Sequence, residues 1–146
     1  MLAVVGGMLL LLCLGGAGIA FVYYDEATKP NRSAPSTAAD GYLRALLVER
    51  DEARADTFAC EETGPLADIR GFRAQVAARE RELSTSIGVK LEDMQVLRED
   101  RSKATIRVSV RWTAEVDGQM QSLLDRWELS LHEQDGWRVC GATRLD

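Results

Sequence analysis

The chain has 146 residues and a formal net charge of −5, from 18 Lys and Arg against 23 Asp and Glu. Basic residues are interspersed with acidic ones, so the continuous basic surface that phosphate backbones require is absent and nucleic-acid binding is not expected. With one histidine and three cysteines the sequence shows no metal-binding signature, and we expect no metal and no cofactor. Arg exceeds Lys, and Ala, Gly and Leu are abundant, a composition typical of a GC-rich genome that suggests an actinobacterial source.

The first segment, Met1 to Tyr24, contains no charged residue. A stretch of this length can cross a ~30 Å hydrocarbon core as one helix, which predicts a single-pass transmembrane anchor over residues 1–24. Two alternatives fit less well. A signal peptide cleaved after Ala20 would need a basic region before the apolar run. A lipoprotein site at Cys13 would need a small residue before the cysteine, where Leu12 stands.

Residues 25–37 hold two of the three prolines together with Ser and Thr, which predicts an extended linker between the anchor and one domain over residues 38–146. The cations that flank the anchor, Lys29 and Arg32, follow it, and this arrangement favours a cytoplasmic C-terminus. The two cysteines of the domain favour the opposite. We predict a cell-membrane protein whose C-terminal domain is extracytoplasmic.

Two helices are predicted at the start of the domain. Ser36 or Thr37 is the expected N-cap of the first, which ends at Cys60. The predicted apolar positions of this first helix are Leu43, Leu46, Leu47, Ala53, Thr57 and Phe58. The second helix is expected to begin at Thr63-Gly64-Pro65 and to end between Ser84 and Gly88. Its predicted apolar face consists of Leu66, Ile69, Phe72, Val76 and Leu83.

From residue 89 onward the apolar period changes from 3.6 to 2, and strands are predicted over residues 89–98 and 104–116. Asp117-Gly118 follows, a typical two-residue hairpin turn. Closing the hairpin there places Val108 opposite Trp127 on the buried face. On the solvated face it places Arg107 opposite Glu128, an opposite-charge pair that supports this register.

A second turn is expected at Asp135-Gly136, before a last strand that ends near residue 145. A two-residue turn would place Cys140 opposite Leu131, with Ala142 opposite Leu129, all on the buried face. A three-residue loop with a bulge would instead bury Val139 and turn Cys140 outward. Either way, the strands form a four-stranded antiparallel sheet.

Helix, helix and then a curved meander that ends in Trp137-Arg138-Val139 resembles the NTF2-like (cystatin-like, SnoaL-like) α+β fold. The resemblance covers about residues 37–146 and implies two helices packed on a curved four-stranded antiparallel sheet. More narrowly, the chain resembles small actinobacterial membrane proteins with one span, a Pro/Ser/Thr linker and such a domain. A ferredoxin-like split arrangement is the alternative, disfavoured because both helices precede every strand. This fold hosts many functions, so it implies none by itself.

In the proteins that the chain resembles, a cysteine at the end of the first long helix commonly occurs together with one in the last strand. Cys60 and Cys140 match these two positions and are the only cysteines outside the predicted anchor. Because thiols of an extracytoplasmic domain are usually paired, we predict a Cys60–Cys140 disulfide. Two buried free thiols are the alternative.

Enzymes of the resembled fold use a buried Asp, often with a Tyr, inside the cone that the curved sheet encloses. Asp125 shares the buried face of Trp127, and Tyr42 is the only tyrosine beyond the anchor. The candidate pocket lining is Tyr42, Trp112, Asp125 and Trp127. Asp125 could act as a base there, but catalysis is not expected and no catalytic residue is assigned. The single histidine, His132, falls on the solvated face.

Two classes of function follow. The first is a membrane-anchored, extracytoplasmic, non-catalytic domain that binds a protein partner or an envelope component. The second is a small-molecule pocket, binding or catalytic, that uses Asp125. A filled cone with an exposed apolar patch favours the first class, and an open cavity that reaches Asp125 favours the second.

Overall fold

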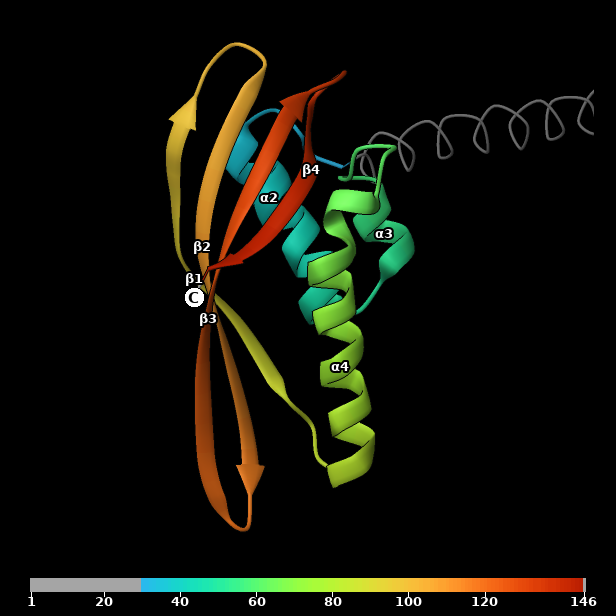
Figure 1. The fold of residues 1–146 in the computed structure, drawn as a ribbon, viewed down its shortest axis with the longest axis vertical. Helices are drawn as coiled ribbons and strands as arrows, with labels where there is room; N and C mark the ends of the chain where they lie inside the picture. Colours follow the sequence, from blue (N-terminus) through green and yellow to red (C-terminus); the bar gives the residue numbers. More distant parts are fainter. Residues whose placement is uncertain (1–29, 146) are drawn as a thin grey trace, which may run out of the picture.

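The computed structural model describes residues 30–145. The predicted transmembrane segment, residues 1–24, lies outside them, and within residues 30–145 no helix is both long and apolar enough to span a bilayer. The fold is α+β, as predicted: the helices come first and a single sheet of four antiparallel strands follows, in the order β1-β2-β3-β4. Helices lie on one side of this sheet (Figure 1).

The first predicted helix is broken into three pieces. They are α2 (Pro35–Leu43), the π-helix η1 (Arg44–Glu49) and α3 (Glu52–Asp56). Arg50 adopts a left-handed conformation with φ 62°, which ends the π-helix. This break changes the helical phase, so Ala53 and Thr57 are exposed, against the prediction, and Ala55 is buried instead.

The start of the helical layer also differs from the prediction. The N-cap of α2 is Ala34 without a side-chain cap, and Pro35 occupies the first turn. Proline is favoured there because its φ is already helical and its missing N–H would have no helical partner. Ser36 and Thr37 therefore lie inside the helix, which begins within the segment predicted to be linker.

The second predicted helix is confirmed as the 3₁₀ turn η2 (Gly64–Leu66) followed by α4 (Ala67–Leu83). Ser84, left-handed with φ 49°, ends it. Of its predicted apolar face, Leu66 and Ile69 are fully buried, Phe72 and Val76 are partly buried, and Leu83 is exposed. Burial thus decreases along α4 toward the lower end of Figure 1.

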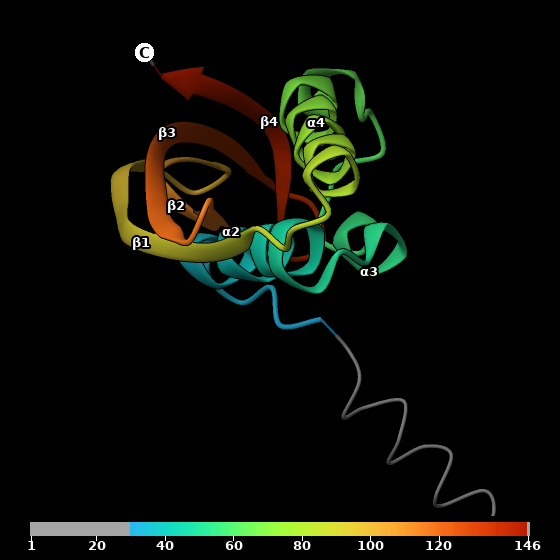
Figure 2. The same ribbon diagram turned by 90° about the horizontal axis from the view of Figure 1, so that it is seen from below.

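The strands are β1 (Gly88–Glu99), β2 (Lys103–Val116), β3 (Gln119–Glu133) and β4 (Trp137–Leu145). The sheet is curled, and α2 lies along its concave side, where it contacts all four strands (Figure 2). The predicted β2–β3 register is confirmed: Val108 lies opposite Trp127, and Arg107 pairs with Glu128 at 3.4 Å. Alternation in the sequence therefore placed the buried face of β2 correctly as far as Trp112, whereas Leu123, predicted to lie opposite Trp112 on that buried face, is 58% exposed.

The β3–β4 pairing follows the second alternative near its turn. Val139, not Cys140, lies opposite Leu131, and a bulge then restores Ala142 to its predicted place opposite Leu129. Val139 is consequently buried and Cys140 only half-buried. Beside the bulge, a Cβ at Gly141 would lie 2.6 Å from the Ser130 hydroxyl oxygen, so glycine permits this close approach of the strands.

The β2–β3 hairpin extends beyond the rest of the sheet. The last β1 partner on β2 is Thr113, and the last β4 partner on β3 is Arg126. The tip of the hairpin, residues 114–121, is a two-stranded ribbon, whereas residues 122–124 of β3 pair with a part of β2 that β1 flanks on its other side. We call residues 114–124 the hairpin arm. It projects at the lower end of Figure 1, away from the β3–β4 turn.

Candidate functional site

An aromatic cluster fills the cone. Phe72 enters from α4, with its ring centroid 5.1 Å from that of Trp112 and 5.7 Å from that of Trp127. The contact with Trp112 is edge-on, the geometry that aromatic pairs prefer. Trp112 and Trp127 are buried, and the register places both on the concave face of the sheet. The three rings thus pack together on the concave side of the sheet.

Asp125 lies at the edge of this cluster, at the base of the hairpin arm. Its side chain is only 5% exposed, and its Oδ1 accepts a hydrogen bond from the Arg144 guanidinium on β4. The guanidinium carbon of Arg144 lies 5.0 Å from the centroid of the Phe72 ring. The cation therefore contacts a carboxylate and an aromatic face together, and its positive charge compensates the buried Asp125.

Three polar atoms of the cluster remain without a hydrogen-bond partner within residues 30–145. They are Oδ2 of Asp125 and the indole Nε1 atoms of Trp112 and Trp127, all buried. A buried polar group without a partner costs roughly 1–3 kcal/mol, so the cluster holds one acceptor and two donors that a bound group could satisfy. We call Phe72, Trp112, Asp125 and Trp127 the acid–aromatic cage.

Tyr42, the fourth predicted lining residue, is directed elsewhere. It is fully buried in α2, and the charged groups that act on its hydroxyl are Arg70, Asp56 and Glu52. Burial raises the pKa of Tyr42, and the Arg70 cation offsets part of this effect. The phenol thus stays neutral at physiological pH and belongs to the α3–α4 side of the core. Three of the four predicted lining residues come together, and Tyr42 does not join them.

A shallow hollow lies beside the aromatic cluster, between α4, η1 and β1. It is lined by Leu47, Arg50, Arg73, Val76, Ala77, Glu80, Val89 and Trp112. Its inner space is about 10 Å³, roughly the minimum that one water molecule occupies. This hollow is too small for a substrate.

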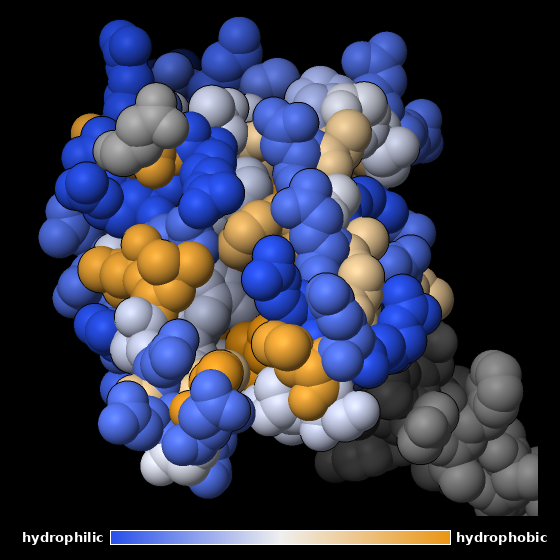
Figure 3. Space-filling view, turned by 60° about the horizontal axis from the view of Figure 1, so that its bottom comes forward, coloured by the Kyte–Doolittle hydropathy of each residue, from blue (hydrophilic) through white to orange (hydrophobic). Residues whose placement is uncertain are grey.

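The hairpin arm exposes large apolar side chains. Met120 is 75% exposed and Leu123 is 58% exposed, and Leu124 is also exposed. Leu123 shares the face of Asp125 and Trp127, whereas Met120 and Leu124 lie on the opposite face. The space-filling view from the lower end shows apolar groups set among polar side chains (Figure 3). The arm is thus apolar on both faces.

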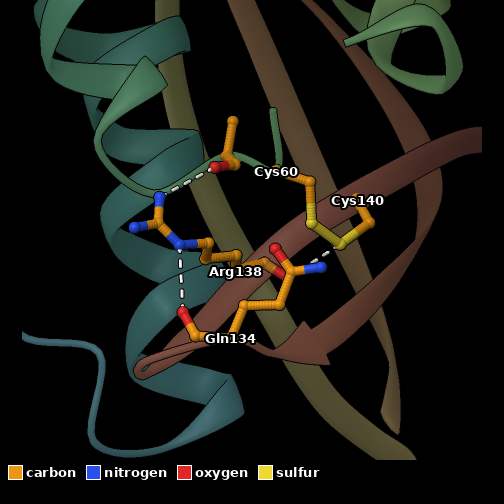
Figure 4. Close-up of a disulfide and its surroundings, with 5 residues drawn as sticks. Cys60, Gln134, Arg138 and Cys140 are labelled. Atoms are coloured by element: carbon orange, nitrogen blue, oxygen red, sulfur yellow. Dashed lines mark hydrogen bonds between the residues drawn. A yellow bond between two sulfur atoms is a disulfide. The ribbon is translucent and has the colours of Figure 1, made fainter. Parts of the chain in front are cut away.

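The predicted cysteine pair comes together at the opposite end of the molecule. Cys60 and Cys140 lie at disulfide distance, with Cα atoms 4.9 Å apart (Figure 4). Backbone hydrogen bonds join the same segments, from the Cys60 N–H to the Val139 carbonyl at 2.9 Å and from the Val139 N–H to the Phe58 carbonyl at 2.8 Å. Cys140 reaches Cys60 across the edge of β4 and does not need to point into the cone.

Arg138 reinforces this junction. Its Nη1 donates to the Ala59 carbonyl at 3.1 Å and its Nε to the Gln134 carbonyl at 3.2 Å (Figure 4). One side chain therefore joins the β3–β4 turn to the segment after α3. We call segment 58–60, the turn 134–136 and residues 137–140 of β4 the closed end.

Sequence reasoning did not assign Phe72 or Arg144 to the site. Phe72 was placed on the apolar face of its helix, without its contact to the tryptophans. The signal for Arg144 was the last strand's register, which puts it opposite Trp127 on the concave face. A cation at an inward-facing position requires an anion nearby, and Asp125 is the acid on that face.

No protein-family model matches the chain, and no curated protein matches it. Among solved structures, it is similar to a protein described as a "putative aromatic ring hydroxylase" from Novosphingobium aromaticivorans. That similarity has 17% sequence identity and a TM-score of 0.49, and covers 73% of this chain and 82% of the other. It is also similar to the intermembrane space region of chloroplast protein ARC6, with 11% identity, a TM-score of 0.39 and coverage of 77% and 97%.

Proposed function

We propose that this chain is a membrane-anchored, extracytoplasmic, non-catalytic domain that binds a protein partner of the cell envelope through its hairpin arm. The observation that carries the proposal is the contrast between the filled cone and the uncovered arm. Inside the cone, aromatic rings take up the space and Arg144 compensates the charge of Asp125. Outside it, apolar side chains of the arm have no cover within the described residues.

The arm has a further property that favours a protein partner. Beyond Thr113 and Arg126 its outer edges have no neighbouring strand within residues 30–145. An isolated two-stranded hairpin is marginally stable in water, and an apolar strand with a free edge is prone to association. A partner that covers the arm would bury the exposed leucines and complete the backbone hydrogen bonding of an edge.

The position of the arm fits this role. The first described residues approach the β3–β4 turn, where the Trp137 N–H donates to the Arg32 carbonyl at 2.9 Å. This contact holds Arg32 at the closed end, and the arm projects from the other end (Figure 1). With an anchor over residues 1–24, the arm would point away from the membrane toward partners in the envelope.

Site-specific photo-crosslinking in the full-length protein tests the proposal. A photoreactive residue at Met120 or Leu124 is expected to give one discrete adduct in membranes of the native host. The matched control places the same residue at Arg79, which is exposed on α4. Adducts that are absent from the arm, or identical at Arg79, would contradict the proposal.

A second candidate function is a small-molecule or catalytic pocket that uses Asp125. The observation in its favour is that one oxygen of that carboxylate and the indole nitrogens of Trp112 and Trp127 are buried without a hydrogen-bond partner within residues 30–145. If the domain is a non-catalytic binding module, Asp125→Asn should abolish no catalytic activity. A turnover assay in which this single substitution removes activity would establish the pocket instead.

A further inference from the structure

We propose that the acid–aromatic cage is a receptor for a guanidinium group, and that Arg144 occupies it as an internal substitute until an arginine of the protein partner replaces it. This inference rests on the proposed function, because it assigns the chemistry by which that partner is recognised. It adds a binding site at the base of the hairpin arm.

The chemistry of the cage selects a cation. A carboxylate surrounded by aromatic rings attracts positive charge through direct ion pairing and through the negative faces of the rings. Arg144 already uses both interactions, with Asp125 and with the ring of Phe72. An anionic or purely apolar ligand would have to displace this cation and leave the carboxylate uncompensated.

Arg144 satisfies the cage incompletely. It donates from Nη2 to Oδ1 of Asp125, while Oδ2 stays buried and without a partner within the described residues. A guanidinium that approaches end-on can donate two parallel hydrogen bonds to both oxygens of a carboxylate, a stronger arrangement than one bond. A guanidinium from outside could therefore make a second hydrogen bond, to Oδ2 of Asp125, that Arg144 does not make.

Arg144 is also placed so that it can leave. Its side chain is 49% exposed, and it lies near the end of β4, opposite Trp127. Movement of its guanidinium into solvent exposes the cage without breaking the pairing of β3 with β4. The exposed Leu123, two residues before Asp125 on the same face, borders the site on the arm side.

The exposed Leu123 of the arm therefore lies next to the buried cage on the same face of β3. A partner that covers Leu123 brings its own side chains to the mouth of the cage. Such a partner would have an arginine next to the apolar residues that contact Leu123, and the cage would bind that arginine. In the absence of the partner, Arg144 keeps the buried carboxylate compensated.

Binding of ethylguanidinium chloride to the full chain in detergent tests the proposal by calorimetry. Arg144→Gln removes the internal competitor, so the apparent affinity should rise roughly tenfold over that of the wild type if Arg144 occupies the cage about nine-tenths of the time. The same ligand should raise the melting temperature of the Arg144→Gln protein more than that of the wild type, measured against sodium chloride at equal ionic strength.

The matched control is Arg107→Gln. Arg107 also pairs with a carboxylate across two neighbouring strands and is 44% exposed, but it lies on the outer face of the sheet. The Arg107→Gln protein should bind ethylguanidinium with the same affinity as the wild type. In the Arg144→Gln background, Asp125→Asn should abolish binding. Phe72→Leu, which keeps an apolar side chain at that position, should weaken binding several-fold.

Two results would overturn the proposal: an Arg144→Gln protein that binds no more tightly than the Arg107→Gln protein, or unchanged binding after Asp125→Asn. Either result with the arm adducts intact would refute the guanidinium site and leave the partner-binding function in place. If no adduct forms from the arm in the otherwise wild-type protein, the partner-binding function itself is refuted. Binding of free ethylguanidinium without any arm adduct would assign the cage to a small molecule and not to a protein side chain.

Discussion

At the closed end, a cysteine pair, two backbone hydrogen bonds and Arg138 join the helical layer to the sheet. At the other end, the hairpin arm extends beyond β4 and its apolar side chains are exposed. β3 runs from the arm to the turn of the closed end and so connects the two ends. One end is therefore cross-linked to the helical layer, whereas the other exposes apolar side chains.

The lower part of α4 stands between these two extremes. Glu80 accepts hydrogen bonds from the Ile87 N–H at 2.7 Å and from Arg50 at 2.6 Å, and so ties the helix to β1 and to the end of η1. Polar side-chain contacts therefore hold α4 beside the cone, whereas a disulfide and backbone hydrogen bonds hold the closed end. Four predictions test the contrast, ordered by the expected effect on stability.

Cys140→Ser should have the largest effect. Its disulfide would link residues separated by 80 positions in the sequence. For a loop of this size the chain-entropy model gives roughly 4–5 kcal/mol as an upper estimate, comparable to the whole margin of a small domain. Thermal melting of the full chain, with and without reductant, measures the loss.

Thiol labelling checks the bridge itself. Unreduced, denatured protein purified from the native host should expose only Cys13, one of three cysteines in the chain. The double variant Cys60→Ser, Cys140→Ser should melt like the single variant. Three labelled thiols in the wild type would refute the disulfide and favour a cytoplasmic location for the domain.

Gly136→Ala should destabilise the closed end by about 1–2 kcal/mol, since L-residues disfavour its left-handed backbone. Gly136 has φ 95°, and an added Cβ would lie 3.0 Å from the Cβ of Arg32. Thermal melting is again the measurement. Gly118→Ala is the control for the added side chain, because that glycine, with φ 75°, has open space around it. Equal losses would show that the linker contact contributes nothing.

Glu80→Gln should lower the free energy of unfolding by about 1 kcal/mol at neutral pH, because it exchanges charge-assisted hydrogen bonds for neutral ones. Burial acts to raise the pKa of Glu80, but the hydrogen bonds from the Ile87 N–H and from Arg50 outweigh it, so the pKa is lowered. A lowered pKa contributes stability above the ordinary glutamate value, and that contribution is lost as the pH falls through the folded-state pKa.

The difference between wild type and Glu80→Gln should therefore be constant at neutral pH and shrink below about pH 4.3, the ordinary glutamate value. Urea unfolding across this range measures it. Glu82→Gln is the matched control, since Glu82 is exposed on the same helix. A difference that grows toward acidic pH would contradict the assigned direction.

Leu124→Ser should have the smallest effect on stability, within roughly 0.5 kcal/mol, because the side chain is exposed on the arm. The same substitution should weaken the photo-crosslink from Met120 several-fold. A large loss of stability would show that the arm supports the fold and would remove the contrast between the two ends.

The sequence by itself determined the central hairpin. The alternation along β2 and the turn at Asp117-Gly118 fixed which residues face the cone, because a slip of one position would invert both faces. It also placed α4 and brought Asp125 together with Trp112 and Trp127. These features depend on local periodicity and turn chemistry, which a single sequence records.

The tertiary structure decided the rest. The run from Arg44 to Asp56 contains no proline or glycine, and only its packing shows the break at Arg50, whose side chain bonds to Glu80. The bulge beside Cys140 depends on a three-residue loop that the sequence left open. The Asp125–Arg144 pair joins residues from two strands, and its guanidinium lies over the ring of Phe72 on α4. Its formation therefore depends on long-range packing. Periodicity determines which face a residue occupies, but only the packed elements determine which charge it meets there.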